Sequence, residues 1–251
     1  MERFSSFDKM PIAYEVSGSE KGASAVILHH GFASTAAINW VRPGLVDALV
    51  EAGRRVVTLD ARGHGSSACP HEPSAYSGGA MASDVRALAD HLGFDSFDMA
   101  GYSMGAYVAL ELAPGESRVS SLFLGGIGLE RMRTDRPEVR AAIVEALEAD
   151  DPSTVADASA RAFRSFADAT RQDRLALAAV ERARGGPDLE AIRTIAVPAV
   201  VVNGDRDTLA GDPAEVAAFL AKGRSLVVPG DHLSAVVQPE FRAAIVEWAT
   251  S

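Results

Sequence analysis

The chain has 251 residues, of which 47% are hydrophobic and 23% are charged, and this composition excludes a disordered or fibrous class. Its formal net charge of −10 disfavours nucleic acid and anionic membrane surfaces as partners. No apolar run is long enough to span a membrane or to form a signal peptide's central region at the start of the chain. Together with a single cysteine, Cys69, these features predict a cytoplasmic protein. The sequence carries no signal for an oligomeric state.

The first half of the chain alternates strand-like and helix-like segments. Alternating apolar residues on either side of a turn at residues 8–9 predict a β-hairpin. Continuous apolar runs predict buried strands over 23–31, 54–60, 94–101 and 119–128. Periodic apolar residues predict helices over 40–52, 79–93 and 104–113. This rhythm, with short connections, predicts an α/β fold in which helices cover both faces of a mostly parallel sheet.

The alternation breaks after residue 128. The segment 129–192 is rich in Ala, Arg, Glu and Asp, has several helix-like stretches and contains no strand-like run. Strand patterns resume over 197–205 and 224–230, each followed by a helix-like stretch. We therefore expect a core domain formed by residues 1–128 and 193–251, and a helical cap formed by residues 129–192 over one end of the sheet.

The stretch "GYSMG" at residues 101–105 places Ser103 between two glycines, where a predicted strand becomes a predicted helix. It matches the Gly-x-Ser-x-Gly nucleophile elbow, in which glycines permit a sharp turn that holds the serine in a strained conformation. The alternative is a glycine-rich strand exit with an idle serine. A nucleophilic serine requires a general base, and that base requires an orienting acid.

Candidates for both partners follow later strands. Asp205 and Asp207 come directly after the strand over 197–205, and His232 comes after the strand over 224–230. The order serine, aspartate, histidine is the one that this strand-turn-helix arrangement uses. The other five histidines precede the two aspartates, and no pair has the His-Glu-x-x-His spacing of a zinc site, so no metal is expected.

These motifs together resemble a serine-dependent α/β-hydrolase of the small, cofactor-free, capped kind that includes esterases and enol-lactonases. "LHHGF" at 28–32 resembles the family's oxyanion loop, and "DARGHGSS" at 60–67 resembles its Asp-x-Arg-Gly-His-Gly-x-Ser signature. The resemblance covers essentially the whole chain. It implies a mostly parallel, eight-stranded type of sheet, a small helical cap in the position of residues 129–192, and no cofactor.

The resemblance also implies roles for individual residues. Ser103 would be the nucleophile and His232 the base, with backbone N–H groups of Phe32 and Met104 as the oxyanion hole. Asp207 would be the orienting acid, because the family's Gly-x-x-Asp spacing counts from Gly204. Asp205 is its rival and is expected to hold the loop through an Asx-type turn.

Further residues are expected around this site in supporting positions. An apolar substrate pocket is predicted from Trp40, Met132, Phe163 and Phe166, although core packing would explain each of them equally well. His30, Asp60 and Arg62 are expected to brace loops.

The expected function is hydrolysis of a carboxylic ester or lactone of a small substrate through an acyl-enzyme. Serine at the elbow argues against haloalkane dehalogenases and most epoxide hydrolases, whose family nucleophile is a carboxylate. Cleavage of a carbon–carbon bond and cofactor-free perhydrolysis remain alternatives that use the same three residues. A small-molecule receptor or sensor with little turnover is the alternative from another class.

Overall fold

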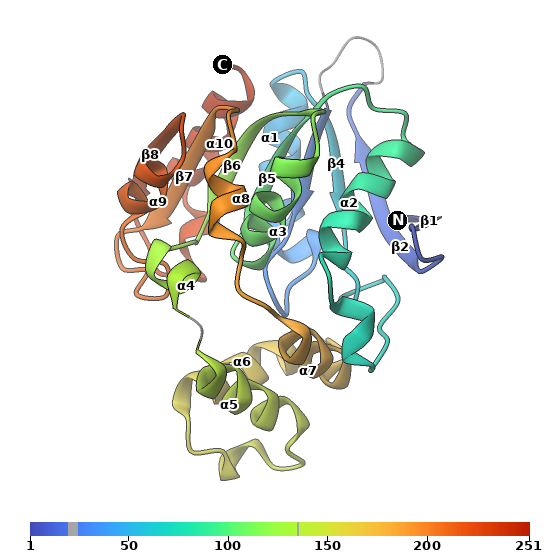
Figure 1. Cartoon of the computed structure of the whole chain (residues 1–251), viewed down its shortest axis with the longest axis vertical. Helices are drawn as coiled ribbons and strands as arrows, with labels where there is room; N and C mark the ends of the chain where they lie inside the picture. Colours follow the sequence, from blue (N-terminus) through green and yellow to red (C-terminus); the bar gives the residue numbers. More distant parts are fainter. Residues whose placement is uncertain (20–24, 135) are drawn as a thin grey trace.

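A single twisted sheet of eight strands forms the centre of the molecule in the computed structural model, which describes residues 1–19, 25–134 and 136–251 (Figure 1). The strand order is β1-β2-β4-β3-β5-β6-β7-β8. Strand β2 is antiparallel to β1 and β4, and the remaining neighbours are parallel, which confirms the predicted mostly parallel sheet. The strands are β1 (Glu2–Ser5), β2 (Pro11–Ser17), β3 (Ala25–His29), β4 (Arg55–Leu59), β5 (Phe97–Tyr102), β6 (Val119–Gly125), β7 (Ala199–Gly204) and β8 (Gly223–Val228).

Helices cover both faces of this sheet, as the sequence predicts. Successive strand residues point to opposite faces, so Ile27 and Val201 belong to one apolar cluster while Val26 and Val200 belong to another. The first cluster includes α2 (Ala80–His91), α3 (Met104–Leu112), α8 (Leu189–Arg193) and α9 (Pro213–Phe219). The second includes α1 (Leu45–Glu51) and α10 (Pro239–Ala249).

Two of the predicted elements differ at their starts. The helix expected over 40–52 is two pieces, a π-helical turn η1 (Ala37–Val41) and then α1. Pro43 lacks a backbone N–H, and Gly44 adopts φ 74°, so the helix cannot continue through this pair. Residues 23 and 24, the start of the strand expected over 23–31, lie outside the described residues, and β3 is described from Ala25.

The helices α5 (Pro137–Glu148), α6 (Ala158–Ala169) and α7 (Arg174–Ala183) form a separate group below the sheet in Figure 1. They share an apolar cluster, which we call the α5–α7 cluster and which includes Ile143, Leu177 and, from the loop after β3, Ala33. The short helix α4 (Leu129–Arg133) leads into it, and α8 follows it and lies against α3. Short 3₁₀ turns complete the chain: η2 (Pro73–Tyr76), η3 (Ala113–Gly115), η4 (Pro152–Thr154) and η5 (Ala235–Val237).

Hydrogen bonds join the α5–α7 cluster to the loops at the carboxyl ends of β3 and β4. The Thr170 hydroxyl donates to the Ala33 carbonyl at 3.1 Å, and the Gln172 side-chain oxygen accepts the Gly65 N–H at 2.9 Å. These contacts place the cluster beside the end of the sheet where the predicted site residues lie. Within the described residues, no helix is long and apolar enough to cross a bilayer.

Candidate active site

Ser103 occupies a sharp turn between β5 and α3, with φ 50° and ψ −113°. A non-glycine residue at this φ stores strain of about 1–3 kcal/mol, and the Ser103 N–H is held by the Gly125 carbonyl at 2.8 Å. The flanking glycines are needed because backbone crowds them on both sides. A Cβ on Gly101 would lie 2.2 Å from the Gly105 oxygen, and a Cβ on Gly105 would lie 2.0 Å from the His29 oxygen. The strained turn expected from the glycine spacing is therefore present.

Gly105→Ala is expected to destabilise the protein by about 3 kcal/mol or more, because the new methyl group meets the β3 backbone and not a flexible side chain. The free energy of unfolding in urea measures this loss. Gly115→Ala is the matched control just beyond the same helix, where the nearest atom, of the Arg86 side chain, lies at 3.5 Å. Equal stability of the two variants would contradict the close approach of α3 to β3.

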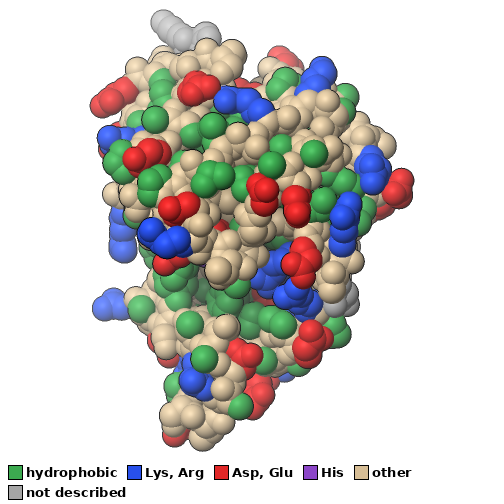
Figure 2. All heavy atoms as spheres, turned by 90° about the vertical axis from the view of Figure 1, so that its left-hand side faces the viewer, with side chains coloured by type: hydrophobic (Ala, Val, Ile, Leu, Met, Phe, Trp, Pro, Cys, Tyr) green, Lys and Arg blue, Asp and Glu red, His purple; other side chains and the backbone are tan. Residues whose placement is uncertain are grey.

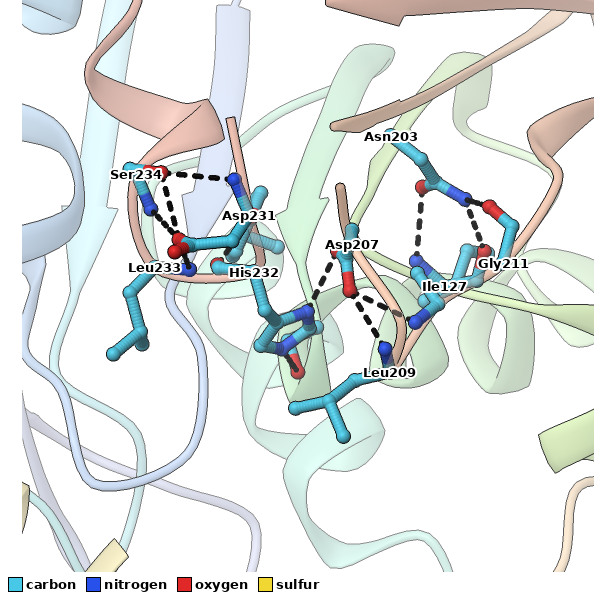
Figure 3. A network of polar contacts seen from close by, with 12 residues as sticks. Ile127, Asn203, Asp207, Leu209, Gly211, Asp231, His232, Leu233 and Ser234 are labelled. Atoms are coloured by element: carbon cyan, nitrogen blue, oxygen red, sulfur yellow. Dashed lines mark hydrogen bonds and ion pairs between the residues drawn. The ribbon is translucent and has the colours of Figure 1, made fainter. Parts of the chain in front are cut away.

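The side chains of Ser103, His232 and Asp207 meet at the carboxyl ends of β5, β8 and β7. The Ser103 hydroxyl donates to His232 Nε2 at 3.0 Å, and His232 Nδ1–H donates to Asp207 Oδ2 at 2.8 Å. Figure 3 shows the imidazole pointing toward Asp207. The Asp207 side chain is completely buried, whereas the His232 side chain is 16% exposed. An imidazole held between a hydroxyl and a buried carboxylate can accept the hydroxyl proton and keep the resulting charge paired.

The loop after β7 distinguishes the two candidate acids. Asp207 Oδ1 accepts the N–H groups of Leu209 and Ala210 at 3.0 and 2.9 Å, which fixes the carboxylate while its other oxygen contacts His232. Asp205 instead accepts the Gly230 N–H at 2.8 Å and lies in a half-exposed position. The expected Asx-type turn at Asp205 is therefore wrong. Asp207 forms that turn, and Asp205 ties its loop to the one that carries His232.

Two buried polar residues position these loops and were missed from the sequence. The Tyr102 hydroxyl donates to the His232 carbonyl at 2.7 Å, and burial raises the pKa of Tyr102, so the hydroxyl keeps its proton. The Asn203 side chain bonds both the N–H and the carbonyl of Ile127 and also the carbonyl of Gly211 (Figure 3). Both residues lie at the end of a buried apolar strand, just before its loop, and a polar residue in that position is the sequence pattern that could have indicated their role.

The predicted oxyanion loop follows β3 and lies against the nucleophile. A Cβ on Gly31 would lie 3.5 Å from Ser103 Cβ, so the backbone of Phe32 is one residue away from this contact. The Asn39 side chain holds the loop by accepting the Gly31 N–H at 2.9 Å. Met104 is the first residue of α3, where an N–H has no acceptor within the helix. Both expected N–H donors therefore belong to backbone segments next to Ser103.

Three histidines lie buried under this loop, and hydrogen bonds require two of them to be neutral. His30 Nε2 accepts the Ala61 N–H at 2.9 Å, and His64 Nε2 accepts the Ala33 N–H at 3.2 Å. Burial lowers the pKa of His29 to about 3 and the pKa of His30 to about 4, and it also lowers the pKa of His64 well below its usual value. The predicted bracing role of His30 is confirmed.

These histidines predict a loss of stability in mild acid. Each has a folded-state pKa below the ordinary 6.5, so the unfolded chain binds more protons and stability falls as the pH drops from about 6.5 toward 4. At pH 5 the expected loss is about 2 kcal/mol each for His29 and His30, and His64 adds to it in the same direction. Urea unfolding at pH 7.5 and pH 5 measures it. The difference in the free energy of unfolding between pH 7.5 and pH 5 should be smaller in His64→Gln and unchanged in the exposed control His71→Gln. A free energy of unfolding that does not depend on pH would contradict the expectation.

The other predicted bracing residues also hold loops by hydrogen bonds. Asp60 accepts the N–H groups of Ala36 and Ser66 at 2.9 and 2.8 Å. Arg62 is buried and pairs with Asp84 at 2.6 Å and with Asp8 at 2.9 Å. The prediction for Asp60 and Arg62 is therefore confirmed.

The single cysteine is not activated as a nucleophile. Burial raises the pKa of the Cys69 thiol to about 11, so it stays protonated at neutral pH. No group of three His, Cys, Asp or Glu side chains among the described residues is arranged to hold a metal ion.

A cavity of about 310 Å³ lies between α2 and α3 on one side and the segments around α5 and α7 on the other. Met104 and Met132 line it, which places the cavity next to the predicted oxyanion donor. Figure 2 shows hydrophobic side chains gathered in a hollow between the sheet with its covering helices and the group α5–α7 below it. A cavity of this size suits a small ligand.

The other three predicted pocket residues do not line this cavity. Trp40 is completely buried in the core on the α1 and α10 face, because η1 turns its indole under the sheet. This corrects the expectation for Trp40. Phe163 contacts the Phe32 ring at a centroid distance of 6.0 Å, and Phe166 packs against the α5–α7 cluster. Phe163 thus lies near the oxyanion loop, and Phe166 belongs to the packing of the helices.

Comparisons with known proteins agree with this architecture. Over 106 residues, 41% of the chain, the sequence is 38% identical to the sn-1-specific diacylglycerol lipase ABHD11 of Mus musculus, and the match spans 32% of that lipase. The fold is similar to that of the enol-lactonase from Burkholderia xenovorans LB400, with a TM-score of 0.84, 22% identity and full coverage of both chains. It is also similar to an esterase from Exiguobacterium antarcticum, with a TM-score of 0.81, 23% identity and 99% coverage of both chains.

The family assignment comes from a sequence model of the alpha/beta hydrolase fold. That model matches residues 24–172, more than half of the chain. The matched region contains the glycine-flanked Ser103 and the braced loops after β3 and β4. The chain therefore belongs to the alpha/beta hydrolase family.

Proposed function

We propose that the protein is a serine hydrolase that cleaves a carboxylic ester or lactone of a small substrate through an acyl-enzyme. The observation that carries the proposal is the Ser103–His232–Asp207 network, with hydrogen bonds of 3.0 and 2.8 Å. The burial of the Asp207 carboxylate beside His232 and the strained backbone of Ser103 support it. The names of the lipase, esterase and enol-lactonase relatives support ester and lactone substrates.

The proposed reaction has two steps that share one geometry. His232 Nε2 takes the proton of Ser103 as its oxygen attacks the carbonyl carbon, and Asp207 pairs with the imidazolium. The N–H groups of Phe32 and Met104 stabilise the oxyanion, and His232 returns the proton to the leaving alcohol. His232 then activates water to hydrolyse the acyl-enzyme. Residues 129–192 act as the cap, with α5–α7 shielding the reacting groups from bulk water.

A fluorophosphonate probe tests this function directly. Intact mass spectrometry of the labelled protein is expected to give one adduct, which disappears in Ser103→Ala, because the probe reacts with an activated serine. A series of p-nitrophenyl esters of increasing chain length on the same preparation is expected to show turnover. An adduct without turnover would favour the receptor alternative, and the absence of both on a folded sample would refute the proposal.

A further inference from the structure

The cavity beside Met104 has a basic lining although the chain as a whole is acidic. Among the described residues, the charged side chains that line it are Arg131, Arg136, Arg140, Arg184, Glu111 and Glu181. Arginines outnumber glutamates in this lining, whereas the chain as a whole has a formal net charge of −10. Basic side chains around a cavity with low-dielectric walls raise the local concentration of anions. In Figure 2, basic side chains flank the hollow between the sheet domain and the helices below it.

Arg131 differs from the other arginines of the lining in its polar contacts. Within the part of the chain that the structure describes, its guanidinium makes no ion pair and no hydrogen bond. Each of the other three already has an interaction partner in the protein: Arg184 with Glu181, Arg136 with Glu130, and Arg140. Arg131 therefore keeps all of its donors available to a molecule in the cavity.

The position of Arg131 connects it to the reacting groups. It lies on α4, directly after β6, and its side chain is half-buried. Met104, whose N–H is a proposed oxyanion donor, lines the same cavity. Tyr107 on α3 also lines it, with the Arg184 guanidinium 5.5 Å from the ring centre. Arg131 and Met104, the residue directly after Ser103, both line this cavity of about 310 Å³, so one small molecule that fills it lies against both residues.

We propose that Arg131 binds a carboxylate of the substrate, so that the enzyme acts on esters or lactones that carry a free carboxylate away from the bond to be cleaved. This inference rests on the proposed function and adds the substrate class. A guanidinium and a carboxylate form charge-assisted, often bidentate hydrogen bonds, which fix orientation as well as adding affinity. A half-buried site strengthens that contact relative to the surface.

Two esters that differ in a single charge test the inference. Mono-4-nitrophenyl adipate carries a terminal carboxylate, and its methyl ester carries the same acyl chain without the charge. The wild-type protein is expected to hydrolyse the charged ester with a kcat/KM about tenfold higher or more. Arg131→Gln is expected to lower kcat/KM for the charged ester about 10- to 100-fold, mainly through KM, and to change the neutral ester less than about twofold.

Arg133→Gln is the matched control. Arg133 lies on the same helix, is exposed, and faces the Phe219 ring at 6.0 Å rather than the cavity. This variant is expected to keep the wild-type preference. Equal wild-type rates on the two esters, or an equal loss on both in Arg131→Gln, would overturn the inference and leave the proposed function intact. The wild-type comparison decides this even if the variant does not fold. Absence of hydrolysis and of a probe adduct would refute both.

Discussion

Replacement of Ser103 by alanine is expected to lower kcat/KM for ester hydrolysis by about 10⁴- to 10⁶-fold. The His232 imidazole would then face a methyl group, so no oxygen nucleophile remains at the turn beside the proposed N–H donors. The fold should survive, because the Ser103 backbone is held by its N–H bond to Gly125 and alanine keeps the same Cβ. Initial rates on a p-nitrophenyl ester, with circular dichroism on the same sample, measure both properties.

An exposed serine supplies the control for this variant. Ser225 lies on the edge strand β8 and is exposed, so Ser225→Ala should retain activity within about twofold. A loss below tenfold in Ser103→Ala would remove Ser103 from the mechanism. The residual rate must then be traced to another group in the protein.

Replacement of Asp207 by asparagine is expected to lower kcat about 10⁴-fold while leaving the loop in place. The asparagine oxygen can still accept the N–H groups of Leu209 and Ala210, which turns its NH₂ group toward His232. That donor would face Nδ1 and favour the tautomer in which Nε2 carries the proton and cannot act as a base. Rates measured against pH, together with thermal unfolding, separate this effect from a loss of folding.

Asp205→Asn is the matched control, because the two aspartates are two residues apart on one loop. Asparagine at position 205 can still accept the Gly230 N–H, so its activity should fall less than tenfold. A larger loss in Asp205→Asn than in Asp207→Asn would show that the wrong carboxylate has been assigned as the acid.

The sheet could be predicted because buried parallel strands leave continuous apolar runs, and β3, β5 and β7 all follow this pattern. The meeting of Ser103, Asp207 and His232 was also predictable, since the carboxyl ends of parallel strands share one edge of the sheet. The start of α1 was missed because apolar periodicity extends through Pro43 and Gly44. Local backbone restriction overrides periodicity at that pair.

Features that depend on contacts between distant segments could not be predicted. An aromatic residue such as Trp40 could line a pocket or pack in the core. It packs in the core because η1 directs its side chain into the apolar cluster on the α1 and α10 face of the sheet. Several arginines follow one another in the segment 129–192, and their spacing does not reveal which of them finds a partner. Arg131 stands out only when α4, α5 and α7 are placed around one cavity.

The order of segments along the chain has a consequence for how the protein could diversify. The Ser103–His232–Asp207 network is assembled from the turn before α3 and the loops after β7 and β8, whereas α5–α7 are inserted between β6 and β7. The Thr170 and Gln172 bonds join that insertion to the loops after β3 and β4, which carry none of these three side chains. The proposed Ser103–His232–Asp207 chemistry and the proposed substrate-selecting Arg131 thus lie in separable stretches of the gene, so recombination at Gly128 and Leu189 could exchange one and preserve the other.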